Sequence, residues 1–506
     1  MNSFWLESNI EVGEKNKQIS SNEKTDVLVI GAGLTGLSTA YYLLRKGYHV
    51  IIVDKEKIGQ KVSGHTTAKI TAQHGLIYDY LMHSFDEGFA RGYLQANQEA
   101  ICNIKQIIDE EKIDCDFEEM PNFVYTTIEE DVQKIKDEVE AINHLTKEET
   151  ASFATDLDLP FPVLGAIKLE KQAQFHPVKY MQGLVKAIQK YGGKIVENSL
   201  VTDVKKEGDR FISKVGENEI DSQYVVLASH YPFINFPGFY FSKMYQVTSY
   251  ALGIETSASL PTGMYLNTGD KVLSFRTFLE SGKRKLIVSG GNHKTGFSPE
   301  SEDFFGYSFL EKQVQEYFPD AKIQYRWNTR DCITLDKVPY IGEFSTFMPN
   351  MFVATGFNKW GMTTSNVAAN IICDKIYGKE NPYERVFDST RFDPVKNFGE
   401  VKNMVKQVAQ SFVTSRLKIP EEDTFAIKND NGGIIKIDGN SVGIYKDVEG
   451  KIYAVNPTCT HLGCLLTWNN VDKTWDCPCH GSRFDYEGKN LYDPAFEDLE
   501  RYEIGS

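Results

Sequence analysis

The chain has 506 residues and a net charge of −15, and its residues are 41% hydrophobic and 25% charged. This length and composition are typical of a globular protein with two or three domains. The negative charge and the absence of a basic run argue against nucleic acid or anionic lipid as a partner. We expect no membrane span, because no stretch approaches about 18 uncharged apolar residues. Residues 1–24, a predicted N-terminal tail, lack an apolar signal segment, so we expect a cytoplasmic protein.

The chain opens with a predicted β-α-β unit. Apolar residues 25–30 predict a buried parallel strand, a helical pattern follows, and residues 48–53 predict the second strand. Helices are expected at about 178–191 and 363–376, and the first of them precedes further strand-like runs. Residues 240–330 alternate short strand-like runs with turn residues, which predicts an antiparallel sheet that forms the wall of a substrate site.

A glycine-rich turn joins the first strand to its helix, with the sequence Gly31-Ala-Gly33-Leu-Thr-Gly36. In such a fingerprint the first glycine permits the tight turn, the second lets a pyrophosphate approach the backbone, and the third allows close helix–strand packing. The helix N-terminus then faces the phosphates. Asp54 ends the second strand and is expected to bind a ribose hydroxyl. The turn therefore predicts a dinucleotide cofactor.

Three features favour FAD over NAD as that cofactor. A polar loop after Asp54 is suited to passing over a flavin, and a long insertion separates the two halves of the nucleotide domain. Late in the chain, a strand and a glycine precede a helix whose positive N-terminal end could face a reduced flavin. The residues expected at FAD beyond the fingerprint are Ser63, Thr66, Thr67, Gly356, Gly361, Met362 and Thr363.

Residues 25–380 resemble the D-amino-acid oxidase and sarcosine oxidase superfamily. The resemblance rests on the fingerprint, on the loop from Ser63 to Ala68, and on the segment from Asp336 to Gly342. It implies a flavin held between a sheet and a loop, a hydride that leaves the carbon next to an amine, and an adenine held by the Val201 backbone. Ser289 stands where sarcosine oxidases carry an oxygen-activating lysine, which favours a dehydrogenase over an oxidase.

The sequence offers three candidates for catalytic residues. We expect His65 either to line the flavin or to be structural. Arg276 and Arg330 could each grip a substrate carboxylate bidentately, or they could have ordinary ion-pair roles. We expect Cys332 to be a small buried residue without a covalent flavin link. Other histidines that could act as acid–base groups are His74, His176, His230 and His293.

Two Cys/His clusters lie near the C-terminus and read Cys459-Thr-His461-Leu-Gly-Cys464 and Cys477-Pro-Cys479-His480-Gly-Ser482. Their spacing predicts a Rieske-type [2Fe–2S] centre, in which two thiolates hold one iron and two imidazoles hold the other. We assign Cys459 and Cys477 to one iron, and His461 and His480 to the other. Ser482 is placed to give a hydrogen bond to a cluster sulfur. The alternative is a zinc site, because Cys and His also bind zinc.

Residues 422–506 resemble the Rieske proteins of cytochrome bc complexes. In those proteins the residues that match Cys464 and Cys479 form a disulfide between the two cluster loops, so the resemblance implies that pairing here. Phe484 replaces a tyrosine whose hydroxyl bonds to a cysteine sulfur in high-potential relatives. The resemblance therefore implies a somewhat lower reduction potential.

The predicted organisation is an α/β FAD-binding Rossmann-like domain with an antiparallel-sheet substrate domain (25–385), a linker with a helix (386–421), and a small all-β Rieske domain (422–506). We expect a FAD-dependent dehydrogenase for a small amine or amino-acid-like substrate. Its electrons would pass to the [2Fe–2S] cluster and leave through an exposed His461/His480 edge to an unknown protein or quinone. The alternative is a Rieske carrier or reductase driven by NAD(P)H or by a partner, without amine oxidation.

Overall fold

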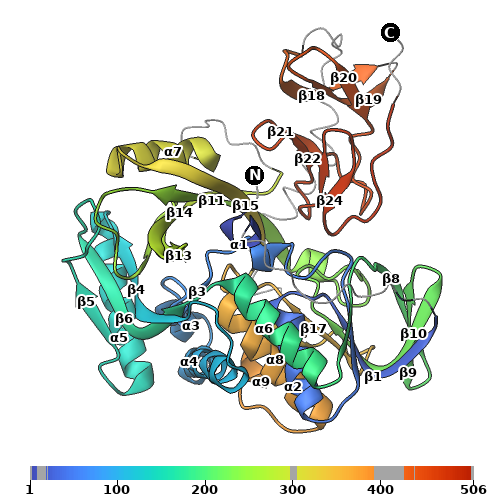
Figure 1. Cartoon of the computed structure of the whole chain (residues 1–506), viewed down its shortest axis with the longest axis horizontal. Coiled ribbons are helices and arrows are strands. Elements are labelled where there is room, and N and C mark those ends of the chain that lie inside the picture. Colours follow the sequence, from blue (N-terminus) through green and yellow to red (C-terminus); the bar gives the residue numbers. More distant parts are fainter. Residues whose placement is uncertain are drawn as a thin grey trace.

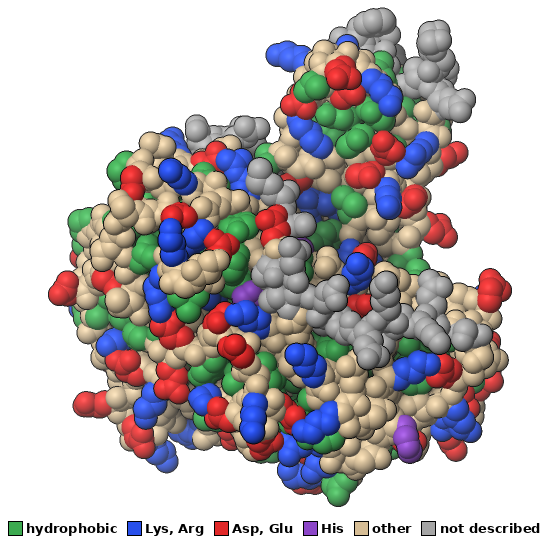
Figure 2. Space-filling view, in the orientation of Figure 1, with side chains coloured by type: hydrophobic (Ala, Val, Ile, Leu, Met, Phe, Trp, Pro, Cys, Tyr) green, Lys and Arg blue, Asp and Glu red, His purple; other side chains and the backbone are tan. Residues whose placement is uncertain are grey.

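A computed structural model describes residues 3–7, 19, 21–296, 305–391, 427–437 and 439–502. These residues form a large α/β body and a smaller β domain that projects from it (Figure 1). The amphipathic helix expected in the 386–421 linker lies outside the described residues. None of the helices described is long and apolar enough to cross a membrane. Figure 2 shows Lys and Arg interspersed with Asp and Glu over the face in view.

The first sheet of the body forms around the predicted β-α-β unit. Its eight strands follow the order β16-β17-β10-β1-β2-β7, with β8 and β9 continuing antiparallel from β10. The parallel pairing of β1 with β2 and β10 explains why both faces of β1 are apolar. The strands are β1 (Glu23–Ile30), β2 (Val50–Val53), β7 (Lys194–Val196), β8 (Val201–Glu207), β9 (Arg210–Val215), β10 (Asn218–Leu227), β16 (Tyr340–Glu343) and β17 (Met351–Thr355).

Helices cover this sheet and form much of the largest core. Helix α2 contacts both α6 and α8, and the three lie side by side in Figure 1. The helices of the body are α1 (Phe4–Glu7), α2 (Leu34–Arg45), α3 (Tyr78–Ser84), α4 (Glu87–Glu111), α5 (Val132–Thr146), α6 (Pro177–Lys190), α7 (Gly306–Tyr317), α8 (Gly361–Tyr377) and α9 (Glu384–Phe387). The predicted Rossmann-like arrangement is therefore confirmed.

The second sheet has nine strands in the order β15-β11-β14-β13-β12-β4-β6-β3, with β5 paired to β6. Its pairs are antiparallel as predicted, except that β12 runs parallel to β4, so the sheet is mixed. The strands are β3 (Lys69–Ile70), β4 (Glu118–Thr126), β5 (Ala151–Ala154), β6 (Gly165–Gln174), β11 (Met244–Glu255), β12 (Met264–Asn267), β13 (Leu273–Glu280), β14 (Lys283–Lys294) and β15 (Lys322–Thr334).

The C-terminal domain is all β, as predicted. One sheet has the order β18-β19-β20 and the other β21-β22-β23-β24, and the second lies nearer the α/β body (Figure 1). The strands are β18 (Asn431–Ile437), β19 (Asn440–Lys446), β20 (Ile452–Val455), β21 (Thr467–Asn469), β22 (Thr474–Asp476), β23 (Arg483–Asp485) and β24 (Asn490–Tyr492).

The start of the predicted N-terminal tail packs into the body. Phe4 and Trp5 of α1 are buried in the largest core. The Trp5 indole Nε1 donates to the Thr66 carbonyl at 2.7 Å, and the Ser3 hydroxyl donates to the carbonyl of Gly64. The assignment of residues 1–24 to a tail is therefore wrong for residues 3–7, because these apolar side chains are buried against the loop that follows β2.

Candidate flavin and cluster sites

The glycine-rich turn has the close contacts that its sequence predicts. Gly31 has φ +112°, and a Cβ there would lie 2.5 Å from the Ala228 carbonyl oxygen. A Cβ at Gly36 would lie 1.9 Å from the oxygen of Gly31, which only glycine avoids. Gly33 is the N-cap of α2 and offers no side chain to the helix N-terminus. Backbone N–H groups at this helix N-terminus can thus donate hydrogen bonds to a phosphate.

Asp54 ties the turn to the end of β2. Its carboxylate accepts from the backbone N–H of Ala32 at 2.6 Å and of Glu56 at 2.8 Å. Burial raises the pKa of Asp54 to about 6, and the two backbone hydrogen bonds oppose that rise. A partly buried carboxylate beside a helix N-terminus at the end of a parallel strand is the arrangement that holds a ribose hydroxyl in dinucleotide-binding folds.

One large cavity begins at this turn and continues to the start of α8. The turn places Gly31 and Gly33 at the cavity, where the backbone can approach a pyrophosphate, and the loop adds the hydroxyl of Ser63, so the residues present fit FAD. The predicted cofactor residues that line the cavity are Gly31, Gly33, Asp54, Ser63, Thr66, Thr67, Val201, Gly361 and Met362, together with the catalytic candidate His65.

Three predicted cofactor residues do not line this cavity. Gly36 packs α2 against the turn, and Gly356 has φ +69°, where a Cβ would lie 2.3 Å from the methyl carbon of Thr334. Thr363 is buried, and its hydroxyl donates to the Thr71 carbonyl at 3.3 Å. These three residues support the residues that line the cavity and do not line it themselves.

Arg276 is also placed outside the cavity, contrary to its predicted role in gripping a carboxylate. Its guanidinium is buried and donates to the backbone carbonyls of Thr67 at 2.8 Å and Ala68 at 2.9 Å. Burial lowers its pKa to about 9. Arg276 therefore holds the loop over the cavity and has no group directed at a substrate there.

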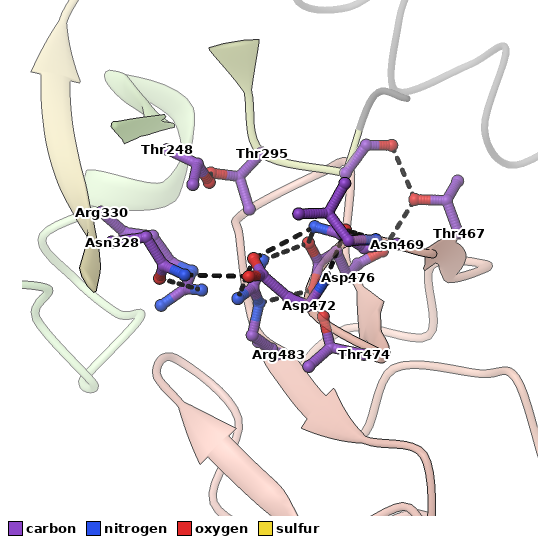
Figure 3. Close-up of polar contacts among 12 residues, drawn as sticks. Thr248, Thr295, Asn328, Arg330, Thr467, Asn469, Asp472, Thr474, Asp476 and Arg483 are labelled. Atoms are coloured by element: carbon purple, nitrogen blue, oxygen red, sulfur yellow. Dashed lines mark hydrogen bonds and ion pairs between the residues drawn. The ribbon is translucent and has the colours of Figure 1, made fainter. Parts of the chain in front are cut away.

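Arg330 lies between the two domains (Figure 3). Its neighbours Thr329 and Asp331 line the cavity, and because side chains alternate along β15, Arg330 lies on the opposite face. Its guanidinium stacks 4.0 Å over the Tyr492 ring and donates to Asn328, whose amide donates to Asp472 at 3.0 Å. The predicted substrate contact is therefore replaced by an interdomain contact.

Several cavity residues were missed as cofactor or substrate contacts. Lys69 and Lys359 line the cavity together with Ser289. The cavity therefore contains lysines even though Ser289 occupies the position of the oxygen-activating lysine. Burial lowers the pKa of Lys69 to about 7, whereas the Lys359 side chain is exposed and its ammonium donates to the Ser249 hydroxyl at 3.0 Å. Asp331 also lines the cavity, as does His230, one of the acid–base candidates that the sequence offered. The sequence could have indicated Lys359, because it lies in the turn before α8, the helix whose N-terminus was expected to face the flavin.

The four predicted cluster ligands come together at the tips of two loops. The rings of His461 and His480 have centroids 5.0 Å apart. Both Nδ1 atoms are buried and have no hydrogen-bond partner among the described residues. Cys459 and Cys477 are free, buried thiols that hydrogen-bond to each other. Two adjacent thiols and two unpartnered imidazole nitrogens fit a Rieske cluster, and burial keeps both imidazoles neutral, as metal ligands must be.

The cysteines beyond the ligands join the two loops. Cys464 and Cys479 form a disulfide, the pairing that the resemblance implies. Their sulfurs lie within 4.8 Å of the Cys477 sulfur, so the disulfide braces the ligand loops directly. Because two members of this three-cysteine group are bonded to each other, the group does not form a separate metal site.

The imidazole edge of the cluster loops faces the α/β body. His480 is only 7% exposed, and its ring lies 5.8 Å from that of Phe241. The His461 Nε2 atom lies 3.0 Å from the Asn235 Oδ1 atom. The expectation of an exposed His461/His480 edge is therefore wrong for His480, which residues before β11 cover, whereas His461 is only partly buried.

Ser482 lies between Cys459 of the first cluster loop and Ala495, which follows β24. Its hydroxyl accepts from the Ala495 N–H at 3.1 Å, and its own proton can be directed at Cys459. The hydrogen bond between the two thiols, and then backbone and Ser482 hydrogen bonds, lower the pKa of Cys459 against the effect of burial, while the contact with Cys459 and burial raise the pKa of Cys477.

Replacing Ser482 by alanine is expected to lower the reduction potential of the cluster by about 60 mV, because a hydrogen bond to sulfur stabilises the more negative reduced state. Potentiometric titration of the cluster absorbance measures this shift. The control Ser441→Ala removes a hydroxyl from β19 and should leave the potential unchanged. An unchanged potential in Ser482→Ala would show that the hydroxyl does not bond to the cluster.

Comparison with known proteins agrees with both sites. Residues 26–375 match the FAD dependent oxidoreductase family (DAO), and residues 418–503 match the Rieske [2Fe-2S] domain. The chain is 37% identical over 486 residues to YhfW of Bacillus subtilis, a protein named for a Rieske 2Fe-2S centre, covering 96% of this chain and 95% of that protein. It is 22% identical over 394 residues to gamma-glutamylputrescine oxidoreductase of Escherichia coli, covering 74% and 86% of the two chains.

The fold of the body is also found among solved structures. Glycine oxidase from Geobacillus kaustophilus superposes with a TM-score of 0.61 at 18% identity, covering 74% of this chain and 100% of that one. The chain therefore belongs to the DAO family of FAD-dependent oxidoreductases and carries a C-terminal Rieske [2Fe–2S] domain. Its cofactors are FAD and a [2Fe–2S] cluster.

Proposed function

We propose that this protein is a dehydrogenase that oxidises a small amine or amino-acid-like substrate and passes the electrons to its own Rieske cluster. Bound FAD would accept a hydride from the carbon next to the amine, leaving an imine. The observation that carries the proposal is that two residues of the C-terminal domain, Asp493 and Phe496, line the cofactor cavity together with residues of the body.

The polar end of the cavity suits a zwitterion. Asp331 and Lys359 both line it, and each perturbs the pKa of the other through its charge. Their opposite charges complement the amine and the carboxylate of an amino acid. Burial lowers the pKa of the neighbouring His230, whose Nε2 atom lies 3.3 Å from the Cys332 sulfur.

A short chain of contacts leads from the cavity to the cluster loops. Phe496 lines the cavity, and its neighbour Ala495 donates to Ser482, which in turn bonds to Cys459. A Rieske cluster carries one electron at a time. This chain of contacts joins the nucleotide end of the cavity to the cluster loops.

Replacing Lys359 by methionine is expected to raise the KM for an amino-acid substrate about tenfold, because a charge-assisted contact to the carboxylate is lost. The experiment screens amino acids and simple amines by anaerobic flavin bleaching and then compares the variant on the best substrate and its decarboxylated analogue. The analogue should be unaffected, as should the control Lys214→Met on the exposed side of β9. No bleaching by any amine, with rapid bleaching by NADH, would contradict the proposal.

A further inference from the structure

The wall of the flavin cavity includes residues from the Rieske domain. Asp493 and Phe496, in the segment that follows β24, line the cavity together with the glycine-rich turn. In a chain with two separate cofactor domains, each domain would be expected to close its own site. Here the site in the α/β body is completed by residues that lie more than 400 positions after the glycine-rich turn in the sequence.

The contacts that hold this segment in place come from the loop after β2 and from Phe233, which follows β10. Lys55 forms an ion pair with Asp493, and both side chains are more than three-quarters buried, at 23% and 21% exposed. The Lys61 ammonium donates to the Leu491 carbonyl at 2.9 Å. The Phe496 ring meets that of Phe233 at 5.5 Å between centroids, so the segment is fixed by charge, backbone and ring contacts.

The segment lies at the nucleotide end of the cavity. Lys55 directly follows Asp54, the carboxylate at the end of β2. The negative charge of Asp493 is one of the causes that raise the pKa of Asp54. Gly31 and Val201 line the same cavity. The family's dinucleotide turn and ribose carboxylate define the ADP half of the FAD site, so Asp493 and Phe496 face that half.

We propose that Asp493 and Phe496 are part of the FAD-binding site and that the docked Rieske domain holds the ADP half of the cofactor. A carboxylate that accepts hydrogen bonds and an aromatic ring are groups that suit ribose hydroxyls and an adenine ring. Because FAD then binds the docked arrangement more tightly, FAD binding and domain docking stabilise each other to the same extent. This inference concerns the cofactor and does not depend on the identity of the substrate.

The first test measures FAD release from the intact holoprotein after dilution, as the rise in free FAD fluorescence. Asp493→Asn keeps the shape of the side chain and removes its charge, and Phe496→Ala removes the ring. Each should release FAD about tenfold faster. The control Glu497→Gln removes a charge from an exposed neighbour that does not line the cavity and should release FAD at the wild-type rate. Cluster absorbance reports that the Rieske domain is still folded.

A second test uses the unmodified protein and guards against misfolded variants. Hydrogen exchange of the 490–496 amides should slow about tenfold when FAD is added to protein stripped of FAD, because FAD favours the docked segment. Amides of β18 and β19, at the far end of the domain, should not change. Wild-type FAD release in both variants with intact cluster absorbance, or exchange at 490–496 that FAD does not slow, would overturn the proposal.

Discussion

Replacing Gly36 by alanine is expected to weaken FAD binding about a hundredfold or more. The added Cβ would lie 1.9 Å from the Gly31 carbonyl oxygen, a backbone atom that cannot rotate away, so α2 must shift from the turn that it caps. FAD content after purification and FAD affinity of the stripped protein measure the effect.

The control for this variant is Gly433→Ala, where a Cβ would meet only the Ile427 side chain at 3.9 Å, an ordinary contact. It should bind FAD as the wild type does. The cluster spectrum of Gly36→Ala should remain, because the Rieske domain has its own cores. Wild-type FAD affinity in Gly36→Ala would refute the geometry described for the turn.

Replacing Cys477 by alanine is expected to remove the [2Fe–2S] cluster. Cys477 is 1% exposed and lies beside Cys459, so no other thiol outside the disulfide can take its place. Iron content should fall from about two atoms per chain to nearly none, and the signal of the reduced cluster in electron paramagnetic resonance should vanish.

Cys373→Ala is the matched control for the cluster variant, because Cys373 is a buried free thiol in α8, far from the cluster loops in sequence. It should keep iron and FAD. Zinc in place of iron in the wild-type protein, or full iron content in Cys477→Ala, would contradict the assignment of the ligands.

Local sequence patterns predicted much of the fold. The strand, glycine turn and helix from Glu23 to Arg45 could be predicted because the apolar run and the glycine spacing are contained in adjacent residues. The parallel pairing of β12 with β4 could not, because it joins segments more than 130 residues apart and neither carries a signal for the other. The buried Phe4 and Trp5 were overlooked within a polar segment, although their apolar side chains were the signal.

The parts of the candidate site that consist of short sequence motifs could be predicted. The cluster loops carry their ligands within a few residues of each other, and the structure brings those ligands together. Arg330 was misplaced because one step along a strand reverses the direction of the side chain, and the sequence did not show which face of β15 meets the cavity. Asp493 and Phe496 could not be assigned to the cavity, since domain docking leaves no pattern in either domain alone.

The most direct test of the proposed function is anaerobic stopped-flow reduction by an amino-acid-like substrate that bleaches the flavin, with flavin and cluster followed at separate wavelengths. The flavin should be reduced first, and the cluster should follow in the same chain at a rate independent of protein concentration. Cys477→Ala should show the first phase without the second. A cluster that stays oxidised while the flavin remains reduced, or peroxide that accumulates once oxygen is admitted while the cluster stays oxidised, would contradict transfer from flavin to cluster.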